Sequence, residues 1–545
     1  MPKTLQTDKM DGTQDQGLAL MFGTHIPGLA LEATLAAAGV PVVVLTYEDL
    51  ALDVNLLAVP QELEGPEGES SVAGGATDVR VDSKKMQSLR PAVAVLLVWC
   101  CLQGGRGNRV YIHPFHLFAA DNVSCETLQT QTAKPLQTLP LAPLDMAVLT
   151  PDHRDPSEQD TQKQNVTQRT AVLAELLNSL GLRVYQALSG KQRGANTLLS
   201  PVNTYGSLVT FYLGASKKTA SSFQQLLGLS SGTDRDDCVS LVDGHKVLKT
   251  LHGISSPVDD ERDVEITTRV WLFSPPHVRL SADVARGARD FSDSSFVRGA
   301  DFARPELVNA FVEKTSDGKM KDAFKDVDVN SNLLFGTLFN FQGNWKTTFQ
   351  PEKTSSQKFH VDETTTVTAP LMTHTGLYQY FNDKARKCTV VKVPLSRRSY
   401  MLVALPHEGA KLRDVEAQLL TKVVSSWRNS LQEGLLELSL PKFSVSAVND
   451  LRELLGNVDA EVEAKLLGSQ AEFGRLGDAD RFVVDKAITK VSFEMSEESA
   501  PSPDKADEAA GAPLKMSVDR PFLFFVLEGE SDAILMLGKI TNPTL

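Results

Sequence analysis

The order of helix-like and strand-like patterns predicts an α+β fold built as one large domain. Apolar residues recur every three or four positions over residues 169–188, the spacing of an amphipathic helix, and Gly190 is expected to end it. Runs of β-branched and aromatic residues bounded by Gly or Pro come later and predict strands at 332–345, 399–406, 435–445, 521–529 and 534–540. Helices gathered early and strands gathered late are typical of this fold class.

The composition is that of an acidic globular protein. The 545 residues carry a formal net charge of −13, and 42% of them are hydrophobic, which argues against a disordered or fibrous chain. So acidic a chain is not expected to bind nucleic acid. The most apolar run, residues 91–105, is shorter than the roughly 20 residues that span a bilayer, so no membrane anchor is expected.

This apolar run fits the core of a signal peptide better than it fits a membrane helix. Gly105 and Gly107 are small residues at the −3 and −1 positions of a cut between Gly107 and Asn108, as signal peptidase requires. The cut would make Asn108 the new amino terminus. A buried strand is the alternative structure for the run.

A translation start at Met86 makes residues 86–107 the signal peptide and predicts a secreted, extracellular protein. Residues 1–85 are then a disordered or mispredicted extension, which agrees with their acidic, Gly- and Ser-rich composition. A working start at Met1 is the alternative, and it would leave the apolar run internal.

Residues 118–168 are expected to form a flexible, glycosylated tail ahead of a domain at 169–545. Scattered prolines and polar residues disfavour long helices in this segment. Asn122 and Asn165 each begin an Asn-x-Ser/Thr triplet, the acceptor sequence for N-glycosylation. The body then begins with the helix at 169–188 and a second helix with Pro201 near its first turn, where proline is favoured.

The cysteines suggest one disulfide and one spare thiol. Cys100 and Cys101 lie inside the proposed signal peptide and would leave with it, so three cysteines remain. In an oxidising compartment, one pair and one spare thiol are the simplest outcome for Cys125, Cys238 and Cys388.

Four segments of the body resemble the serpin family in order and spacing: residues 196–229, 339–372, 438–445 and 519–543. The second and fourth are the most specific, and the resemblance covers about 169–545. It implies a fold of three β-sheets with eight or nine helices and an exposed reactive-centre loop, preceded by an irregular N-terminal tail. It also implies that Cys125 pairs with Cys238, with Cys388 as the spare, buried thiol.

The segment directly after the proposed signal cut resembles the angiotensin family of peptide hormones at nine of ten positions, with Asn108 in place of Asp. The peptide comprises Asn108, Arg109, Val110, Tyr111, Ile112, His113, Pro114, Phe115, His116 and Leu117. The resemblance implies that renin cuts between Leu117 and Phe118. Angiotensin-converting enzyme then cuts between Phe115 and His116, and the product acts on an angiotensin receptor in blood pressure and salt/water balance.

The residues themselves agree with this processing. No Lys or Arg follows the segment until Lys134, so a nearby cut at a basic site is excluded. The available bond joins two apolar residues, Leu117 and Phe118. Pro114 is expected to keep the segment extended, because it removes a backbone donor and biases His113 away from helical geometry. The clefts of aspartic proteases accept such extended substrates.

The product ending at Phe115 suits receptor binding. Arg109 offers a charge, Tyr111 and Phe115 offer aromatic anchors, and Pro114 lowers the entropy lost on binding. A zinc site is the alternative for the two histidines of HPFH. It is disfavoured because Pro114 opposes a helix and the motif contains no cysteine or carboxylate, so no metal or other cofactor is expected.

The segment expected to form the reactive-centre loop, residues 493–518, argues against protease inhibition. An inhibitory serpin inserts this loop into its main sheet as a strand. Pro501 and Pro503 each remove a hydrogen-bond donor from such a strand, and several carboxylates would have to enter the sheet: Glu497, Glu498, Asp504, Asp507 and Glu508. The body is therefore expected to be a scaffold without inhibitory activity.

Two alternative functions remain open, and an enzyme is the least expected class. The chain could be an inhibitory serpin acting on a serine protease, or a carrier serpin whose body binds a small hormone and therefore has a ligand pocket. An enzyme is not expected, because the sequence has no nucleophile elbow, no aspartic-protease motif, no zinc-protease motif and no phosphate-binding loop.

Overall fold

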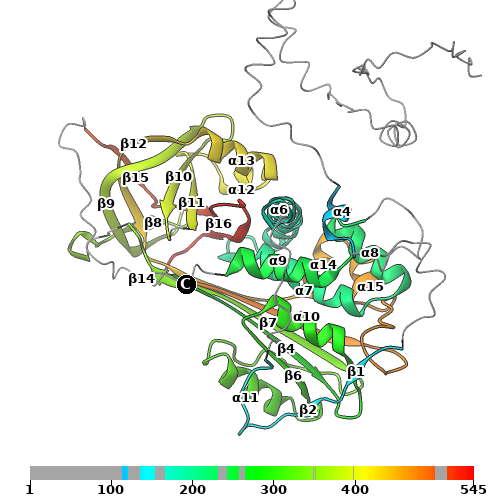
Figure 1. The fold of residues 1–545 in the computed structure, drawn as a ribbon. Coiled ribbons are helices and arrows are strands. Elements are labelled where there is room, and N and C mark those ends of the chain that lie inside the picture. The colour runs from blue at the N-terminus through cyan, green and yellow to red at the C-terminus, as the bar shows by residue number, and fades with distance from the viewer. Residues whose placement is uncertain are drawn as a thin grey trace, which may run out of the picture. The chain divides into compact units, whose positions relative to one another are not determined.

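The computed structural model describes residues 113–120, 135–153, 166–230, 242–256, 264–496 apart from 348, 350 and 397, and 512–545. Every described residue belongs to the unit Arg109–Leu545. Figure 1 shows this unit as twisted sheets flanked by helices. The expected α+β class is confirmed, and the described strands form three sheets.

The main sheet has six strands in the order β13-β14-β7-β4-β6-β2. β14 runs parallel to β7, β7 antiparallel to β4, and both β4 and β2 parallel to β6. The strand bounds are β2 Ala142–Pro143, β4 Val264–Ser274, β6 Ser294–Gly299, β7 Leu333–Asn344, β13 Ser444–Asp450 and β14 Val484–Ser496.

The second sheet has nine strands in the order β15-β12-β9-β10-β11-β16-β17-β3, with β8 paired to β9. Its strands are β3 Thr197–Leu199, β8 Ser355–His360, β9 Thr366–Asp383, β10 Cys388–Pro394, β11 Ser399–Pro406, β12 Gln432–Pro441, β15 Leu514–Ser517, β16 Phe522–Glu528 and β17 Ile534–Ile540. The third sheet pairs β1 (Thr138–Leu139) with β5 (Leu280–Ser281).

Four of the five expected strands match single strands of the structure: β7, β11, β16 and β17. The fifth, at 435–445, is wrong as one strand. It is divided between β12 of the nine-stranded sheet and β13 of the six-stranded sheet. The chain changes sheets at Phe443, whose ring packs on Phe493 of one sheet and Phe524 of the other, with centroid distances of 5.7 and 5.5 Å.

The described ranges contain eleven α-helices, against the eight or nine that the resemblance implied. Two of them, α4 and α12, are only five residues long. The bounds are α4 Pro114–Phe118, α6 Val166–Lys191, α7 Pro201–Gly214, α8 Lys217–Leu227, α9 Gly244–Ser255, α10 Ala282–Phe291, α11 Pro305–Thr315, α12 Leu412–Glu416, α13 Thr421–Ser430, α14 Leu451–Val458 and α15 Ala460–Leu466. No helix in these ranges is long and apolar enough to cross a membrane.

The two expected early helices are α6 and α7. α7 begins as the sequence indicated: Ser200 caps it by accepting a hydrogen bond from the backbone N–H of Asn203 at 3.2 Å, and Pro201 occupies the first turn. Every residue of α7 is buried. It is therefore the central helix of the core.

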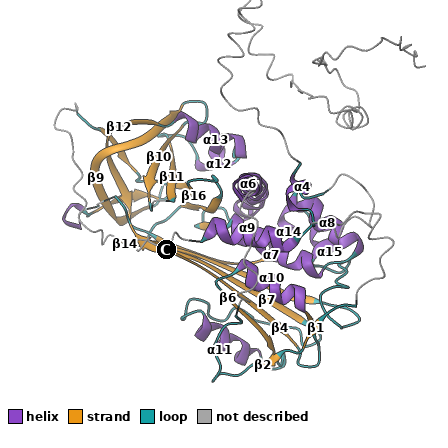
Figure 2. Cartoon of the chain, in the orientation of Figure 1, coloured by secondary structure: helices purple, strands orange, loops and turns teal. Residues whose placement is uncertain are grey.

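Both faces of the main sheet are covered, as Figure 2 shows for α10 on one side and α11 on the other. Along β4 the side chains alternate between two cores: Val270 and Leu272 join the larger one, and Trp271 and Phe273 join the one beneath α11. This alternation explains why β4 is apolar over consecutive residues rather than at every second position.

Residues 135–153 lie against the body, so the expectation of a loose tail throughout 118–168 is wrong for this part. β2 adds a parallel strand to the edge of the main sheet at β6, and Asp152 forms an ion pair with Arg298 at 2.6 Å. Three apolar side chains of the segment pack against the core beneath α11: Leu144, Met146 and Leu149. A sheet edge with unpaired backbone groups explains why a proline-containing segment is ordered there.

Candidate functional site

The second half of the peptide segment forms the short helix α4. His113 is the N-cap residue, with φ −58° and ψ 131°, and its Nδ1 accepts a hydrogen bond from the backbone N–H of Phe115 at 3.3 Å. Pro114 is the first helical residue, and the N–H of His116 donates to the carbonyl of His113 at 3.0 Å.

The expectation of an extended segment is therefore right for His113 and wrong for Pro114–Phe118. The residue before a proline is biased toward extended geometry, and His113 has it. A proline at the first helical position costs nothing, because the N–H that it lacks would have no partner within the helix. Proline therefore breaks a helix when it lies in the interior, but it is favourable at the first helical position.

α4 lies against α6 and α9 (Figure 1) and buries the bond expected to be cut. Leu117 is 8% exposed and Phe118 is 0% exposed, and both belong to the larger core. Phe115 is half-buried against the same core, whereas His116 is exposed. A buried bond in a helix cannot enter the cleft of a protease in this conformation.

The carbonyl groups on both sides of this bond are hydrogen-bonded to the body. The Nε of Arg169, on α6, donates to the carbonyl oxygen of Leu117 at 3.1 Å, and Arg169 is itself buried. The backbone N–H of Asp243 donates to the carbonyl oxygen of Phe118 at 2.7 Å. The segment is therefore fixed from two helices at once.

The chain beyond the bond is also held. Ala119 forms an isolated antiparallel bridge with Val242, and the Nζ of Lys246 donates to the carbonyl oxygen of Ala119 at 3.0 Å. Asp243 organises this corner, since its carboxylate caps α9 by accepting from the backbone N–H groups of His245 and Lys246 at 3.0 and 3.2 Å.

Sequence reasoning missed Arg169, Asp243 and Lys246 as partners of the peptide. A signal for Arg169 was present: it lies four and eight positions before Leu173 and Leu177, both fully buried, so an arginine stands on the apolar face of α6. A buried arginine needs an acceptor. Nothing in the sequence indicated that the acceptor would be the carbonyl of Leu117.

The rings of the two histidines lie near one another in the structure. The ring centroids of His113 and His116 are 6.2 Å apart and the rings are edge-on to one another. Within the residues described, no group of three or more His, Cys, Asp or Glu side chains could hold a metal ion.

Several predicted positions lie outside the described residues. They are Gly107, Asn108, Arg109, Val110, Tyr111, Ile112, Asn122, Cys125, Asn165 and Cys238. The signal cut, both glycosylation triplets and the Cys125–Cys238 pair therefore stay predictions. Cys388 is described, and it is free and buried, as expected of the spare thiol. Burial, with a smaller contribution from the charge of Asp383, raises the pKa of the Cys388 thiol to about 12.

β14, the strand from whose end the expected loop continues, is paired with β7 along its length, so no gap for a further strand lies between these two. β14 and β7 pair directly from Val484↔Leu333 to Ser496↔Asn344, and the backbone N–H of Trp345 donates to the carbonyl of Ser496 at 3.1 Å. β15 begins at Leu514 in the other sheet. Residues 497–511, which hold the two prolines and the carboxylates of the expected loop, lie outside the described residues.

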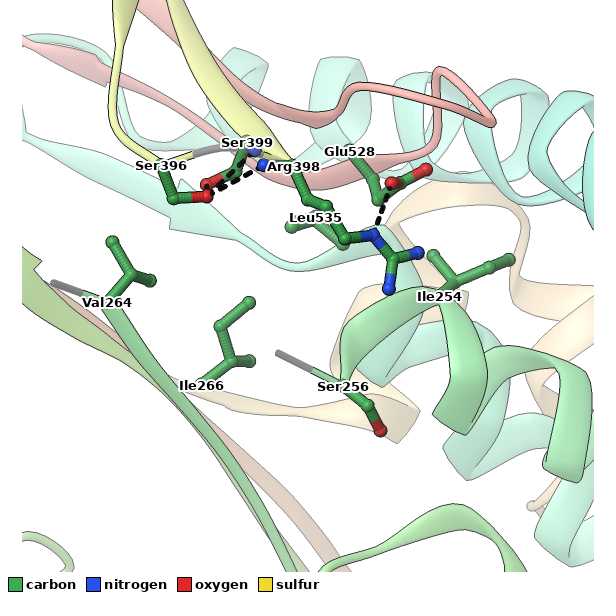
Figure 3. A pocket seen from close by; sticks show the side chains of 9 residues that line it. All are labelled: Ile254, Ser256, Val264, Ile266, Ser396, Arg398, Ser399, Glu528 and Leu535. Atoms are coloured by element: carbon green, nitrogen blue, oxygen red, sulfur yellow. Dashed lines mark hydrogen bonds and ion pairs between the residues drawn. The ribbon is translucent and has the colours of Figure 1, made fainter. Parts of the chain in front are cut away.

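A small hollow lies where the end of α9, the start of β4 and the hairpin between β10 and β11 meet (Figure 3). The Nε of Arg398 donates to the carboxylate of Glu528 at 3.1 Å, and Ser396 Oγ accepts from the backbone N–H of Ser399 at 2.9 Å. The cavity holds about 10 Å³, which is room for roughly one water molecule. It is too small for a hormone.

The sequence is similar to a known protein family and to proteins of known function. A family model described as Serpin (serine protease inhibitor) matches residues 175–543. The chain is 30% identical over 477 residues to angiotensinogen of Bos taurus, covering 84% of this chain and 98% of that protein. It is 29% identical over 484 residues to angiotensinogen of Homo sapiens, with the same coverage.

Two solved structures show the same fold. Human thyroxine-binding globulin, complexed with thyroxine, superposes with a TM-score of 0.58 at 25% identity, covering 69% of this chain and 99% of that one. Mouse protein Z-dependent protease inhibitor superposes with a TM-score of 0.61 at 21% identity, covering 70% and 100%.

Proposed function

The chain belongs to the serpin family, and from this premise we propose that it is the secreted, extracellular precursor of a vasoactive peptide hormone. Renin releases the decapeptide Asn108 to Leu117 by cutting before Phe118. Angiotensin-converting enzyme then removes His116 and Leu117, and the octapeptide ending at Phe115 acts on an angiotensin receptor in the control of blood pressure and salt/water balance.

The position of the peptide is the observation that carries this proposal. The hormone-like segment begins directly after the expected signal cut, and the mammalian angiotensinogens are similar to this chain over 84% of its length. The receptor would recognise the side chains of Arg109, Tyr111 and Phe115 in the released peptide. The carboxylate at Phe115 exists only after both cuts, so the precursor is inactive until it is processed.

Cleavage requires that α4 open first. A five-residue helix is not stable alone in water, so α4 persists through the burial of Phe118 and the hydrogen bonds to Leu117, Phe118 and Ala119. Renin captures the fraction of molecules in which this segment has left the body and become extended. The rate of cleavage is therefore proportional to that fraction, and it is lower than for a segment that is always extended.

The body acts as a holder for the peptide rather than as an inhibitor or an enzyme. A disulfide between Cys125 and Cys238 would attach the chain just beyond the cut to the segment that precedes α9 in the sequence. The loop that it closes is 113 residues long, for which chain entropy gives a stabilisation of about 4 to 5 kcal/mol. Asp243 and Lys246, which donate hydrogen bonds to the carbonyl oxygens of Phe118 and Ala119, lie five and eight residues after Cys238 in the sequence.

The test is to incubate the full secreted chain with renin and to analyse the products by mass spectrometry. The expected product is the decapeptide ending at Leu117, followed after addition of angiotensin-converting enzyme by the octapeptide ending at Phe115. A synthetic peptide of residues 108–121 serves as the control for renin activity, and it should be cut faster than the chain. An intact Leu117–Phe118 bond in the chain, with the peptide cut, contradicts the proposal.

A further inference from the structure

The described part of the chain has a second, larger cavity, which the peptide does not use. It lies at the carboxyl end of α6, where α12 and the end of β17 meet, and has a volume of about 620 Å³. Cavities of roughly 300–1,000 Å³ are the size that binds small organic molecules. The residues that matter for its chemistry are Ser189, Arg193, Lys411, Arg413, Glu416 and Lys539.

A preorganised polar network lines the floor of this cavity. The buried Lys539 donates from Nζ to Ser189 Oγ at 2.6 Å and lies 3.5 Å from Oε1 of Glu416. The same carboxylate oxygen accepts from the hydroxyl groups of Tyr185 and Ser189 at 2.8 and 2.7 Å. The charge of Glu416 is therefore compensated within the protein and leaves little repulsion for an anion above it.

The rim is positively charged. Arg193, Lys411 and Arg413 lie around the opening and are exposed. Arg193 donates to the carbonyl of Gly190 at 3.3 Å, and Arg413 lies 3.6 Å from Asp414, a contact between two largely exposed side chains. Among the residues that line the cavity, Glu416 is the carboxylate and it is already paired to Lys539, whereas three exposed cations line the same space. The chain has a net charge of −13, so this concentration of positive charge is local.

Apolar surface completes the lining. Leu412, Ala417 and Pro521 contribute to the walls, so the cavity joins an apolar wall to a cationic rim. Sites of this type bind molecules that have an apolar body and one fixed charge. A purely inorganic anion would leave the apolar wall unused, and a neutral apolar molecule would leave the rim unused.

We propose that this cavity is a binding site for a small organic anion, with its carboxylate or sulfonate at the Arg193–Lys411–Arg413 rim and its apolar body against Leu412 and Pro521. The site lies on the opposite end of α6 from Arg169, which holds the peptide segment. The inference does not rest on the proposed precursor function. Its failure would leave the renin experiment unaffected, and the reverse is also true.

The experiment titrates the full chain with 8-anilinonaphthalene-1-sulfonate and follows the fluorescence of this aromatic anion. The expected result is saturable binding at one site. N-phenyl-1-naphthylamine, which has the same rings without the sulfonate, should bind more weakly. Changing the rim with Arg193→Gln, Lys411→Gln and Arg413→Gln together should weaken binding of the sulfonate by roughly tenfold, since each exposed cation contributes modestly.

The matched control removes three positive charges elsewhere, with Lys325→Gln, Lys353→Gln and Lys358→Gln, all at exposed positions. A second variant, Ala417→Trp, fills the cavity without changing its charge and should abolish binding of both probes at this site. Thermal unfolding confirms that each variant is folded. Equal affinity for the neutral probe, equal loss in the matched control, or full binding by Ala417→Trp would each overturn the proposal.

Discussion

The Nε of Arg169 lies 3.1 Å from the carbonyl oxygen of Leu117, so a buried cation on α6 is hydrogen-bonded to the bond proposed for cleavage. The two residues are 52 positions apart in the chain. A protease that must polarise this carbonyl competes with Arg169 for the same oxygen. The contact therefore opposes cleavage both by holding α4 closed and by occupying the acceptor.

Replacing Arg169 by methionine should accelerate release of the decapeptide by about tenfold, since a hydrogen bond from a charged donor is worth about 1.5 kcal/mol. Initial rates of cleavage by renin, measured by mass spectrometry, check this. Arg183→Met is the matched control, because Arg183 lies on the same helix but is exposed. A rate equal to that of the unmodified chain would show that Arg169 does not limit opening.

The amino terminus of the secreted protein should be Asn108. The two small residues at Gly105 and Gly107 determine this cut, and Edman sequencing of protein from the culture medium measures it directly. A terminus at or before Met86 would mean that the apolar run at 91–105 is retained and that the peptide begins inside a longer tail.

Mixing the chain with trypsin-like and elastase-like serine proteases should give no covalent complex that survives boiling in detergent. β14, from whose end the loop continues, is paired with β13 on one side and β7 on the other, so a strand inserted beside it would have to break one of these pairings; on the β7 side this includes the stacked rings of Phe341 and Phe493. Pro501 and Pro503 would then each leave a strand position without a donor. A known inhibitory serpin provides the positive control, and a stable complex formed by this chain would establish the alternative function.

The sequence predicted the elements whose stability is local and missed those that depend on distant partners. β7, β11, β16 and β17 are bounded by Gly or Pro and could be read from their own residues. α4 could not, because five residues do not form a helix without help. Its partners, Arg169 and Asp243, are supplied by helices that follow much later in the chain.

The same distinction explains the error at 135–153. Locally, prolines at positions 135, 140, 143 and 151 interrupt this segment, which is the pattern of an irregular tail. In the structure Asp152 forms an ion pair with Arg298, and β2 pairs with the edge strand β6. Neither contact could be predicted from the residues of this segment alone.

The apolar run at 435–445 shows the same difficulty. Its sequence pattern is that of one strand, but the packing of Phe443 against both sheets divides it into two.

Asp383 should make stability depend on pH in the acid range. Burial by itself would raise the pKa of this carboxyl, but hydrogen bonds from Trp427 Nε1 at 2.8 Å and Arg386 Nη1 at 2.9 Å outweigh it and hold the pKa below 3.8. Because the pKa is lower in the folded state, the stabilisation is fully present above the unfolded pKa and is lost as pH falls through the folded pKa.

We therefore expect Asp383→Asn to lower the free energy of unfolding by about 2 kcal/mol at pH 7 and by less at pH 2. Urea unfolding at both pH values measures the difference. Asp480→Asn, at an exposed position, is the control and should change little at either pH. An equal cost of Asp383→Asn at the two pH values would contradict the role assigned to its charge.

The thiols provide a test of how the segment after the cut is attached. Cys388 is buried and its pKa is raised to about 12, so at pH 8 only about one molecule in ten thousand carries the reactive thiolate there. The native secreted chain should therefore not react with Ellman's reagent, and the unreduced chain in denaturant should show one thiol. Peptide mapping of the unreduced chain should then find Cys125 joined to Cys238. Three thiols in denaturant, or a link from Cys125 to Cys388, would remove the proposed tether and leave α4 held by its contacts with α6 and α9 alone.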